Sequence, residues 1–410
     1  MEDIKLLEIL DAGRLKSILS EVIFMFSLTP KNANENPVST IYAVEGANGN
    51  DGSLNRLLEL MDIEGLKFYK SKRNGSLQGP SGLIAEDDVV IVKVNSQWDE
   101  YGMTNTDLVK AVTAAVLAHP DGFSGEVVIA DNGQAQYGSS GHGGSLDYTV
   151  NNAEDRRQSV RIVADSFKGL GLVSTYLWDT ITEKQVKEYS EGNDEDGYII
   201  AETADPLTGV LPSYPKFKTL HGTRISFKKG IWDPKRRVYQ VGLLKVLNLP
   251  VLKSHFIYGV TGAVKHYMGV PSDKLTSARG FRTHMTVGKG GMGTLMTETR
   301  VPALNIVDAI HVNCKPGTGP KTPFDGATYA GVIAACEDPV ALDYWASKNI
   351  LCTLGKKVHK VDVSLFDPDN KTTGCFGDWL RLAAVELNEA GQPFTCNEEQ
   401  IAVKVAGKNL

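Results

Sequence analysis

The chain has 410 residues, of which 42% are hydrophobic and 22% charged, and its formal net charge is -6. This length suits about two domains of ~100–200 residues, and the acidic balance argues against a general nucleic-acid binder. No apolar run approaches the ~20 residues that span a bilayer, and the acidic start Met-Glu-Asp lacks the basic region of a secretory signal. We therefore expect a cytoplasmic protein without a membrane span.

Cysteine spacing excludes several cofactors. The five cysteines are odd in number and form no CxxC pair, which argues against a disulfide framework, a structural zinc and an intrinsic iron–sulfur cluster. The chain also lacks the dinucleotide-binding fingerprint, so no nicotinamide cofactor is expected. Free or buried thiols in a reducing compartment are the simplest interpretation.

Strand-like and helix-like segments alternate along the chain. Apolar residues with helical spacing predict that 1–37 forms an amphipathic helix packed on the body, with a membrane-surface helix as the alternative. Continuous β-branched runs at 87–95 and 125–133 flank a capped helix at 104–119, which predicts a βαβ unit with parallel strands. Further strands are predicted at 37–46, 172–181, 244–252 and 301–313, and further helices at 52–70, 151–171, 338–351 (with Asp338 as N-cap and Pro339 at the first helical position) and 376–391.

These patterns predict an α/β fold, with largely parallel sheet or sheets flanked by helices and a less regular second lobe or insertion. The basic stretch 216–239 carries turn signals, so a surface hairpin or meander is a better interpretation than an anion-binding patch. The expected organisation is an N-terminal helix at 1–37, an α/β half at 38–150, a less patterned insertion or lobe at 151–240 and a second α/β half at 241–410.

Polar residues collect where four predicted strands end. In open α/β sheets, ligands bind outside the carboxyl ends of the strands. If these strands are parallel neighbours, their polar ends meet in one crevice. The four ends carry Lys93 with Asn95, Asp131 with Asn132, Lys253 with His255, and Asp308 with His311.

The stretch 246–269 places a second Lys-His pair, Lys265 and His266, on a helix predicted to follow the third of these ends. Thr261 is the expected N-cap of that helix. The small residues from Gly262 onward would leave its free amide groups open to an anion. Because the nearby lysines add positive charge, a site for a carboxylate or phosphate is favoured.

Four of the eight histidines fall between residues 255 and 311, more than even spacing would give. Histidine is the usual group for proton transfer near neutral pH. We therefore expect His255 or His266 to move a proton and Asp131 or Asp308 to orient a histidine or bind a cation. For each histidine taken alone, a structural role is the alternative.

A divalent metal site is another use of the same atoms. Asp131, His142, Asp308 and His311 offer suitable donors, but no spacing such as HExxH supports them. His142 lies in the glycine-rich segment 132–148, which could cover a site.

The same blocks resemble a known family, the domain of unknown function family 362. The resemblance lies in VIVKVN, TNTDLVKAVTAAVL, EVVIADNG, LNLPVLKSHFIYGVTGAVKHYMG, IVDAIHVN…GTGPKTPFDG and DPVALDYWASK, in this order from about Val89 to Leu354. The resemblance implies no assigned activity, and the scattered cysteines depart from the ferredoxin-like segment that many members carry. A fold like that of the nickel-pincer lactate racemases is a further expectation. The positions that the resemblance implies are Lys93, Asn95, Asp131, Lys253, His255, Thr261, Gly262, Lys265, Gly269, Asp308, Gly319 and Asp343.

The leading hypothesis is an enzyme that binds a small anionic organic molecule and uses acid/base chemistry, such as isomerisation, epimerisation or elimination. The alternatives are a non-catalytic carrier of an anionic cofactor or metal complex, and a redox component that borrows its cluster from an iron–sulfur protein partner. The expected catalytic residues are His255, His266, Lys253 and Asp308. The expected substrate-binding residues are Lys93, Asn95, Asp131, Thr261, Gly262, Lys265, Gly319 and Asp343.

Overall fold

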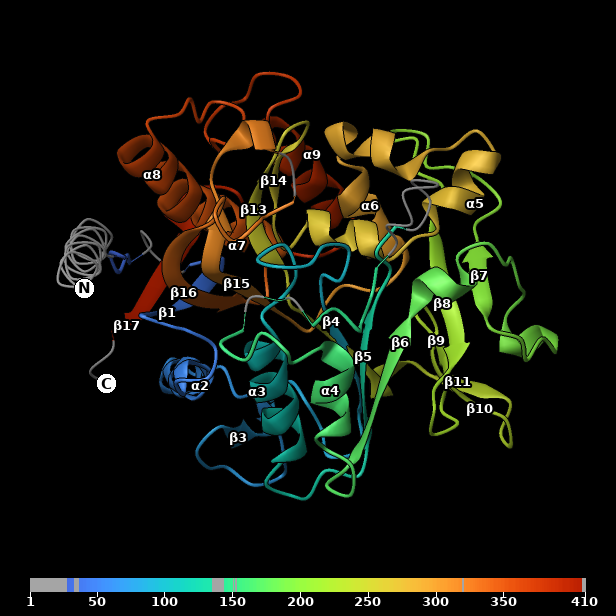
Figure 1. The fold of residues 1–410 in the computed structure, drawn as a ribbon. Coiled ribbons are helices and arrows are strands. Elements are labelled where there is room, and N and C mark those ends of the chain that lie inside the picture. Colours follow the sequence, from blue (N-terminus) through green and yellow to red (C-terminus); the bar gives the residue numbers. More distant parts are fainter. Residues whose placement is uncertain are drawn as a thin grey trace, which may run out of the picture.

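The computed structural model contains a ten-stranded, mainly parallel sheet with helices on both faces, and a separate five-stranded antiparallel sheet (Figure 1). This arrangement confirms the α/β fold class. The predicted N-terminal helix falls almost wholly outside the described residues, as do His142 and Gly319. The structure describes residues 28–32, 37–134, 144–149, 151, 153–318 and 321–407.

The large sheet has the strand order β17-β1-β16-β15-β12-β4-β5-β6, with β13 and β14 attached beside β15. Strands β12, β4, β5 and β6 are consecutive parallel neighbours, which confirms the parallel βαβ unit around α3 (Thr106–Leu117). The strands are β1 (Ser39–Glu45), β4 (Val89–Lys93), β5 (Glu126–Asp131), β6 (Leu172–Leu177), β12 (Leu244–Asn248), β13 (Val251–His255), β14 (Gly259–Thr261), β15 (Leu304–Asn313), β16 (Thr328–Cys336) and β17 (Ile401–Ala406).

Two hydrophobic cores lie on opposite faces of this sheet. Val90 and Val92 of β4 pack into the core with α2 (Ser53–Ile63), α3 and α4 (Val160–Asp165). Ile91 packs into the other core, which contains residues of α6 (Gly291–Glu298), α7 (Pro339–Ala346) and α9 (Phe376–Glu389). Because strand side chains alternate between faces, Lys93 belongs to the same face as Ile91, beneath the second helical layer.

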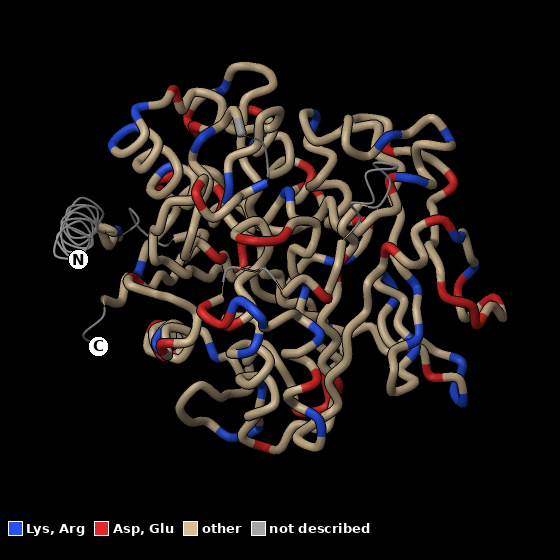
Figure 2. The backbone as a smooth tube through the Cα atoms, in the orientation of Figure 1, with Lys and Arg blue, Asp and Glu red and all other residues tan. Residues whose placement is uncertain are grey.

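The antiparallel sheet confirms the predicted meander at 216–239. In Figure 2, an acidic loop at 191–196 lies at the edge of this sheet, and its Asp194 pairs with Arg224 at 2.6 Å. The basic residue is thus neutralised within the chain, in agreement with the structural interpretation of this stretch. The strands are β7 (Gly197–Ile200), β8 (Ser213–Lys218), β9 (Arg224–Ser226), β10 (Gly230–Asp233) and β11 (Val238–Gln240), and a further pair is β2 (Tyr69–Lys70) with β3 (Gln78–Gly79).

Helix ends follow their capping residues. Asp338 accepts the amides of Val340 and Ala341 at the start of α7, with Pro339 at the first position, as predicted. The helix predicted at 151–171 is wrong in its bounds, since only Val160–Asp165 is helical. The Asn151 side chain donates to the Gln158 carbonyl, and such local bonds compete with a helical backbone. Ser159 then caps α4.

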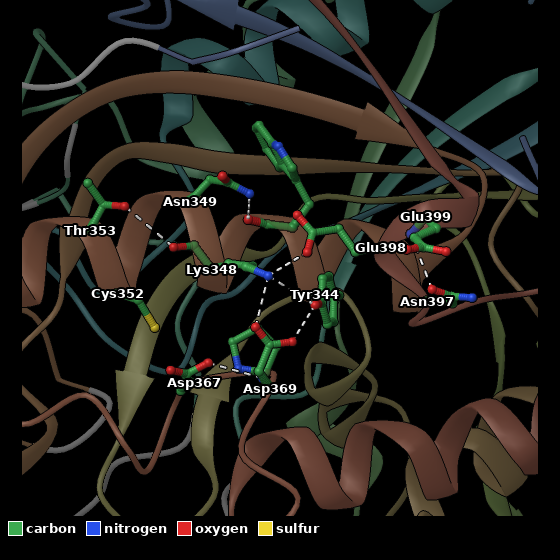
Figure 3. A network of polar contacts seen from close by, with 12 residues as sticks. Tyr344, Lys348, Asn349, Cys352, Thr353, Asp367, Asp369, Asn397, Glu398 and Glu399 are labelled. Carbon is green, nitrogen blue, oxygen red and sulfur yellow. Dashed lines mark hydrogen bonds and ion pairs between the residues drawn. The ribbon is translucent and has the colours of Figure 1, made fainter. Parts of the chain in front are cut away.

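A charged network joins the C-terminal elements (Figure 3). The backbone continues beyond α7 in π-helical turns at Ser347–Leu351, where Lys348 Nζ lies 2.8 Å from Asp369 Oδ2 and 2.5 Å from Glu398 Oε2. Tyr344 also donates to Asp369. These contacts tie α7 to the segments before α9 and β17. Among the described residues, no helix is long and apolar enough to cross a membrane.

Candidate functional site

A cavity of about 410 Å³ opens at the carboxyl ends of β4 and β5. All of these strands are parallel. In the order of the sheet, β5 and β6 follow on one side of β4, whereas β12 and β15 follow on the other side. The cavity therefore lies where the strand order reverses, the usual ligand position in open α/β sheets. Its lining includes seven of the predicted site residues: Asn95, Asp131, Lys253, His255, Thr261, Lys265 and His266.

The floor of the cavity is a buried ion pair. Lys93 Nζ, with no exposed side-chain surface, lies 2.9 Å from Asp131 Oδ1. The other oxygen of Asp131 accepts the amide of Ser96 at 2.8 Å. Gly269 lies directly on this pair, because a Cβ placed there would come within 2.5 Å of Asp131 Oδ1 and 2.7 Å of Lys93 Nζ. Lys93 therefore holds the floor in place through Asp131.

Gly269→Ala is expected to lower the free energy of unfolding by about 1–3 kcal/mol, because the added methyl group pushes the ion pair apart in a packed interior. Gly242→Ala is the matched control, since a Cβ there meets nothing within 4 Å. Urea denaturation of both variants measures the difference. Equal stability of the two would contradict the close packing of Gly269 on the pair.

The Lys-Ser-His stretch lies inside a strand, not after one. The predicted strand at 244–252 is two strands, β12 and β13, separated at Leu249 and Pro250. Lys253 and His255 belong to β13, where Lys253 lies opposite Thr261 of β14. This antiparallel pairing brings Lys253 and Thr261 together in the cavity wall, where the sequence prediction had placed them at a strand end and a helix start.

The helix predicted to begin at Thr261 is also wrong. Thr261 ends β14, and the helical turns are a short 3-10 segment at Lys265–Gly269. The amides of Ala263 and Val264 are not open to an anion, because they donate to the two carboxylate oxygens of Asp343 at 2.5 and 2.9 Å.

Asp343 of α7 is fully buried, and burial raises its pKa to about 7. A Cβ at Gly262 would collide with this carboxylate, so glycine permits the contact between the two segments. Asp343 thus anchors the backbone that carries Lys265, and neither Gly262 nor Asp343 lines the cavity.

Asp343→Ala is expected to lower the free energy of unfolding by about 2–4 kcal/mol, because two buried amides lose their acceptors. Asp343→Asn keeps one acceptor oxygen and should lose roughly half as much. Urea denaturation at pH 8 compares the three proteins. An alanine variant as stable as the wild type would show that the two amides find other acceptors.

Two buried lysines face the cavity without a carboxylate partner among the described residues. Lys253 Nζ donates to the Gly102 carbonyl at 2.6 Å. Burial, together with the nearby charge of Lys265, lowers the pKa of Lys253 to about 7, against the opposing effects of Asp131 and Asp308. Burial alone lowers the pKa of Lys265 to about 7. Both amines therefore change charge near neutral pH.

Two of the three histidines that line the cavity, His255 and His266, are bonded differently. His255 Nδ1 accepts the amides of Ile257 and Tyr258, each at 3.2 Å. Burial, then the charge of Lys265, lowers its pKa, so the ring is neutral with its single proton on Nε2. His255 therefore offers a hydrogen-bond donor and has no free basic nitrogen.

His266 has both ring nitrogens engaged within the protein. Nδ1 lies 2.7 Å from Asn248 Oδ1, and Nε2 lies 2.9 Å from the Val94 carbonyl. Burial and nearby lysines lower its pKa, whereas the bond to Val94 opposes the shift. Although His266 lines the cavity, it presents no free nitrogen to a ligand.

Three buried polar atoms in the lining have no hydrogen-bond partner within the described part of the chain: Asn95 Oδ1, Trp98 Nε1 and Thr261 Oγ1. A buried polar group without a hydrogen bond is costly. Two donors and one acceptor around a cavity therefore indicate a polar occupant.

Comparison with known families supports the resemblance seen in the sequence. Residues 241–348 match the family model described as Domain of unknown function (DUF362). This segment is therefore similar to the DUF362 family. The match contains Lys253, His255, Lys265 and His266, and it covers the later part of the wider range over which the sequence resembles the family. No curated protein and no solved structure matches the chain.

The mouth of the cavity is apolar and basic, and the residues that form it belong to the matched range 241–348. Phe256 and Met285 are 54% and 66% exposed, and Ile257 lies beside them in the lining. Arg282 reaches the same mouth and pairs with Asp273 at 3.9 Å. An occupant would therefore meet charged groups in the interior and apolar groups at the entrance.

The fourth predicted strand end lies away from this cavity. Asp308 is in the middle of β15, where its carboxylate accepts the amide of Asn105 at 2.8 Å and that of Ile310 at 3.1 Å. His311 stacks on Tyr101 with ring centroids 4.0 Å apart. Within the described part of the chain, no three His, Cys, Asp or Glu residues are grouped so that they could hold a metal ion.

Sequence reasoning missed Trp98, Arg282, His284 and Met285, which all line the cavity. His284 and Met285 belong to the 3-10 segment Thr283–Lys289, and Arg282 is the residue before it. All three follow the stretch 246–269 in the sequence and are not part of it. His284 was counted in the histidine cluster at 255–311 but given no role of its own, and that cluster was the only sequence signal for any of the four.

Proposed function

We propose that this protein is an enzyme that binds a small organic carboxylate or phosphate in this cavity and moves a proton on it. The observation that carries the proposal is the pair of buried lysines without a carboxylate partner. A buried ammonium is costly unless an anion compensates it, and a bound anion supplies that compensation. Isomerisation, epimerisation and elimination are the reaction types that this chemistry serves.

Lys253 and Lys265 have different roles in this proposal. Two amines that interact in one cavity lose their protons in two steps, so one can be charged while the other is neutral. Lys253, which donates to Gly102, suits the charged role and holds the anion. Lys265 suits the role of base, because an amine with a pKa of about 7 can accept a proton near neutral pH.

His255 takes a supporting role and not the proton-transfer role expected from the sequence. Its Nε2–H can donate to an oxygen on which negative charge develops, as a neutral imidazole does in other enzymes. His266 supports the wall, and Asp131 is occupied by Lys93. The proton-transfer assignment therefore passes from the histidines to Lys265.

The proposal is tested in two steps. Native and denaturing mass spectrometry of the same preparation first identifies any small anion that remains bound. Candidate carboxylates and phosphates are then incubated with the protein in D₂O, and ¹H NMR follows exchange of carbon-bound hydrogen. We expect exchange in the wild type, a loss of at least 100-fold in Lys265→Met, on the scale of a lost general base, and no change in Lys110→Met, an exposed control. Binding without exchange for every compound would contradict catalysis.

A carrier of an anionic cofactor is the second candidate, and the apolar mouth favours it. Exposed Phe256 and Met285 suit a ligand whose apolar part extends out of the cavity, or a protein that receives it. Such a carrier needs the lysines for binding but no proton transfer. Binding without exchange in D₂O is the outcome expected of it.

A further inference from the structure

The unusual feature of Lys265 is that its amine has no hydrogen-bond partner among the described residues, although the side chain is buried in the cavity wall. Lys265 is 5% exposed, and Tyr258 is its neighbour, with the ring centroid 5.6 Å from Nζ. Lys253 differs, because its amine is held by the Gly102 carbonyl. The lone pair of a neutral Lys265 is therefore unoccupied, which is the state that a nucleophilic amine requires.

The groups around Lys265 are arranged to receive a carbonyl compound. Lys253, His255 and His284 line the same cavity as Lys265, and the charge of Lys265 lowers the pKa of each of them. A second cationic amine beside a desolvated lysine is one of the environments that keep lysine neutral and nucleophilic. The donors His255 Nε2 and Thr261 Oγ1 can bind a carbonyl oxygen, and the Lys253 ammonium can bind a carboxylate.

We propose that Lys265 forms an imine with the carbonyl carbon of a small oxo acid bound in this cavity. The amine attacks the carbonyl carbon, and the electrons of the C=O double bond move to the oxygen. The amine nitrogen gives up both of its hydrogens, which leave with that oxygen as one water molecule, and a C=N bond remains. The step needs no oxidant or reductant.

This inference rests on the proposed function and narrows its substrate class. In this narrower assignment Lys265 is the imine-forming amine and no longer the base. The protonated imine withdraws electrons from the neighbouring carbon, so that this carbon more readily loses a proton to water in the cavity or loses its carboxylate as carbon dioxide. Proton transfer next to a carbonyl is the reaction that the cavity is proposed to perform. A substrate with both a carboxylate and a carbonyl group matches the one charged lysine and the one neutral lysine.

The test traps the imine by reduction. The full chain is incubated with pyruvate, acetoacetate or 2-oxobutyrate in the presence of sodium cyanoborohydride, and intact mass and peptide mapping locate any adduct. We expect one adduct per chain, on Lys265. It should be absent in Lys265→Met and Lys265→Arg, reduced in Lys253→Met and unchanged in Lys110→Met. Circular dichroism confirms that each variant is folded, and the arginine variant keeps the charge without the nucleophile.

Thermal shift with the same oxo acids, without reductant, separates the two proposals. A shift without an adduct on Lys265, or adducts spread over surface lysines, overturns the imine while the anion site stands. Neither a shift nor an adduct with any of the three acids overturns the oxo-acid assignment, and the D₂O exchange experiment then decides the proposed function independently.

Discussion

Replacing Asp131 with asparagine is expected to lower the free energy of unfolding by about 3–5 kcal/mol, because it leaves a buried ammonium without its counter-charge. Lys93 has no exposed side-chain surface, and Asp131 is its ion-pair partner at 2.9 Å. Burial lowers the pKa of Lys93, and the carboxylate of Asp131 opposes that shift. Without the carboxylate, the folded protein must bury the charge or release the proton, and both cost free energy at pH 7.

Urea denaturation measures this loss of stability. Two further variants show whether the loss comes from the unpaired ammonium. The double variant Lys93→Met/Asp131→Asn removes the charge as well and should recover most of the stability, since an apolar replacement of a buried pair is often neutral. Asp165→Asn is the matched control, because its ion pair with Lys168 is more than half exposed and should contribute no more than about 1 kcal/mol. A double variant no more stable than Asp131→Asn would show that the loss comes from other contacts of Asp131.

Local patterns in the sequence predicted the elements whose cause is local. The βαβ unit around α3 follows from β-branched runs and a capped helix, whose N-cap is Asn105. The start of α7 follows from Asp338 and Pro339. The crevice at the strand ends followed from a general rule for α/β sheets, once β4, β5 and β12 proved to be parallel neighbours.

The predictions failed where distant residues decide the local structure. The segment after Thr261 lacks a long helix, and its amides are held by Asp343, about 80 residues later in the chain. Both nitrogens of His266 are taken, one by Asn248 at the end of β12 and the other by Val94, the residue after β4. Val94 lies outside the motif, and although Asn248 belongs to it, nothing in the motif shows that Asn248 contacts His266. The residue types of the site could therefore be predicted from the sequence, whereas their division between binding and support could not.

The tautomer of His255 illustrates the same limit on a smaller scale. The sequence offers a histidine in a basic motif, which suggests a base. The structure adds two backbone amides, from Ile257 and Tyr258, that occupy Nδ1. These amides belong to the turn between β13 and β14, and that turn exists because the two strands pair. The chemistry open to His255 is thus set by strand pairing.

Replacing Lys265 with methionine is expected to make the ligand-free protein more stable at pH 7, by about 3–5 kcal/mol. The amine has a pKa of about 7 in the folded chain against an ordinary value of 10.5. Below pH 7 both states hold the proton, and the folded state bears the full cost of a buried ammonium. Between pH 7 and 10.5 the unfolded chain binds more protons, so the stability of the wild type rises with pH across this window. Above it the amine is neutral in both states and the cost is gone.

The advantage of Lys265→Met should therefore be largest at and below pH 7 and shrink steadily toward pH 10.5. Urea denaturation of the wild type and the variant at pH 6, 7, 8.5 and 10 follows this difference, with Lys110→Met as the exposed control that should differ from the wild type by less than about 0.5 kcal/mol at every pH. A difference that does not depend on pH would contradict the shifted amine. Residues required for function often lower the stability of the folded protein. The stability gained on replacing Lys265 therefore measures how much this buried amine destabilises the ligand-free protein.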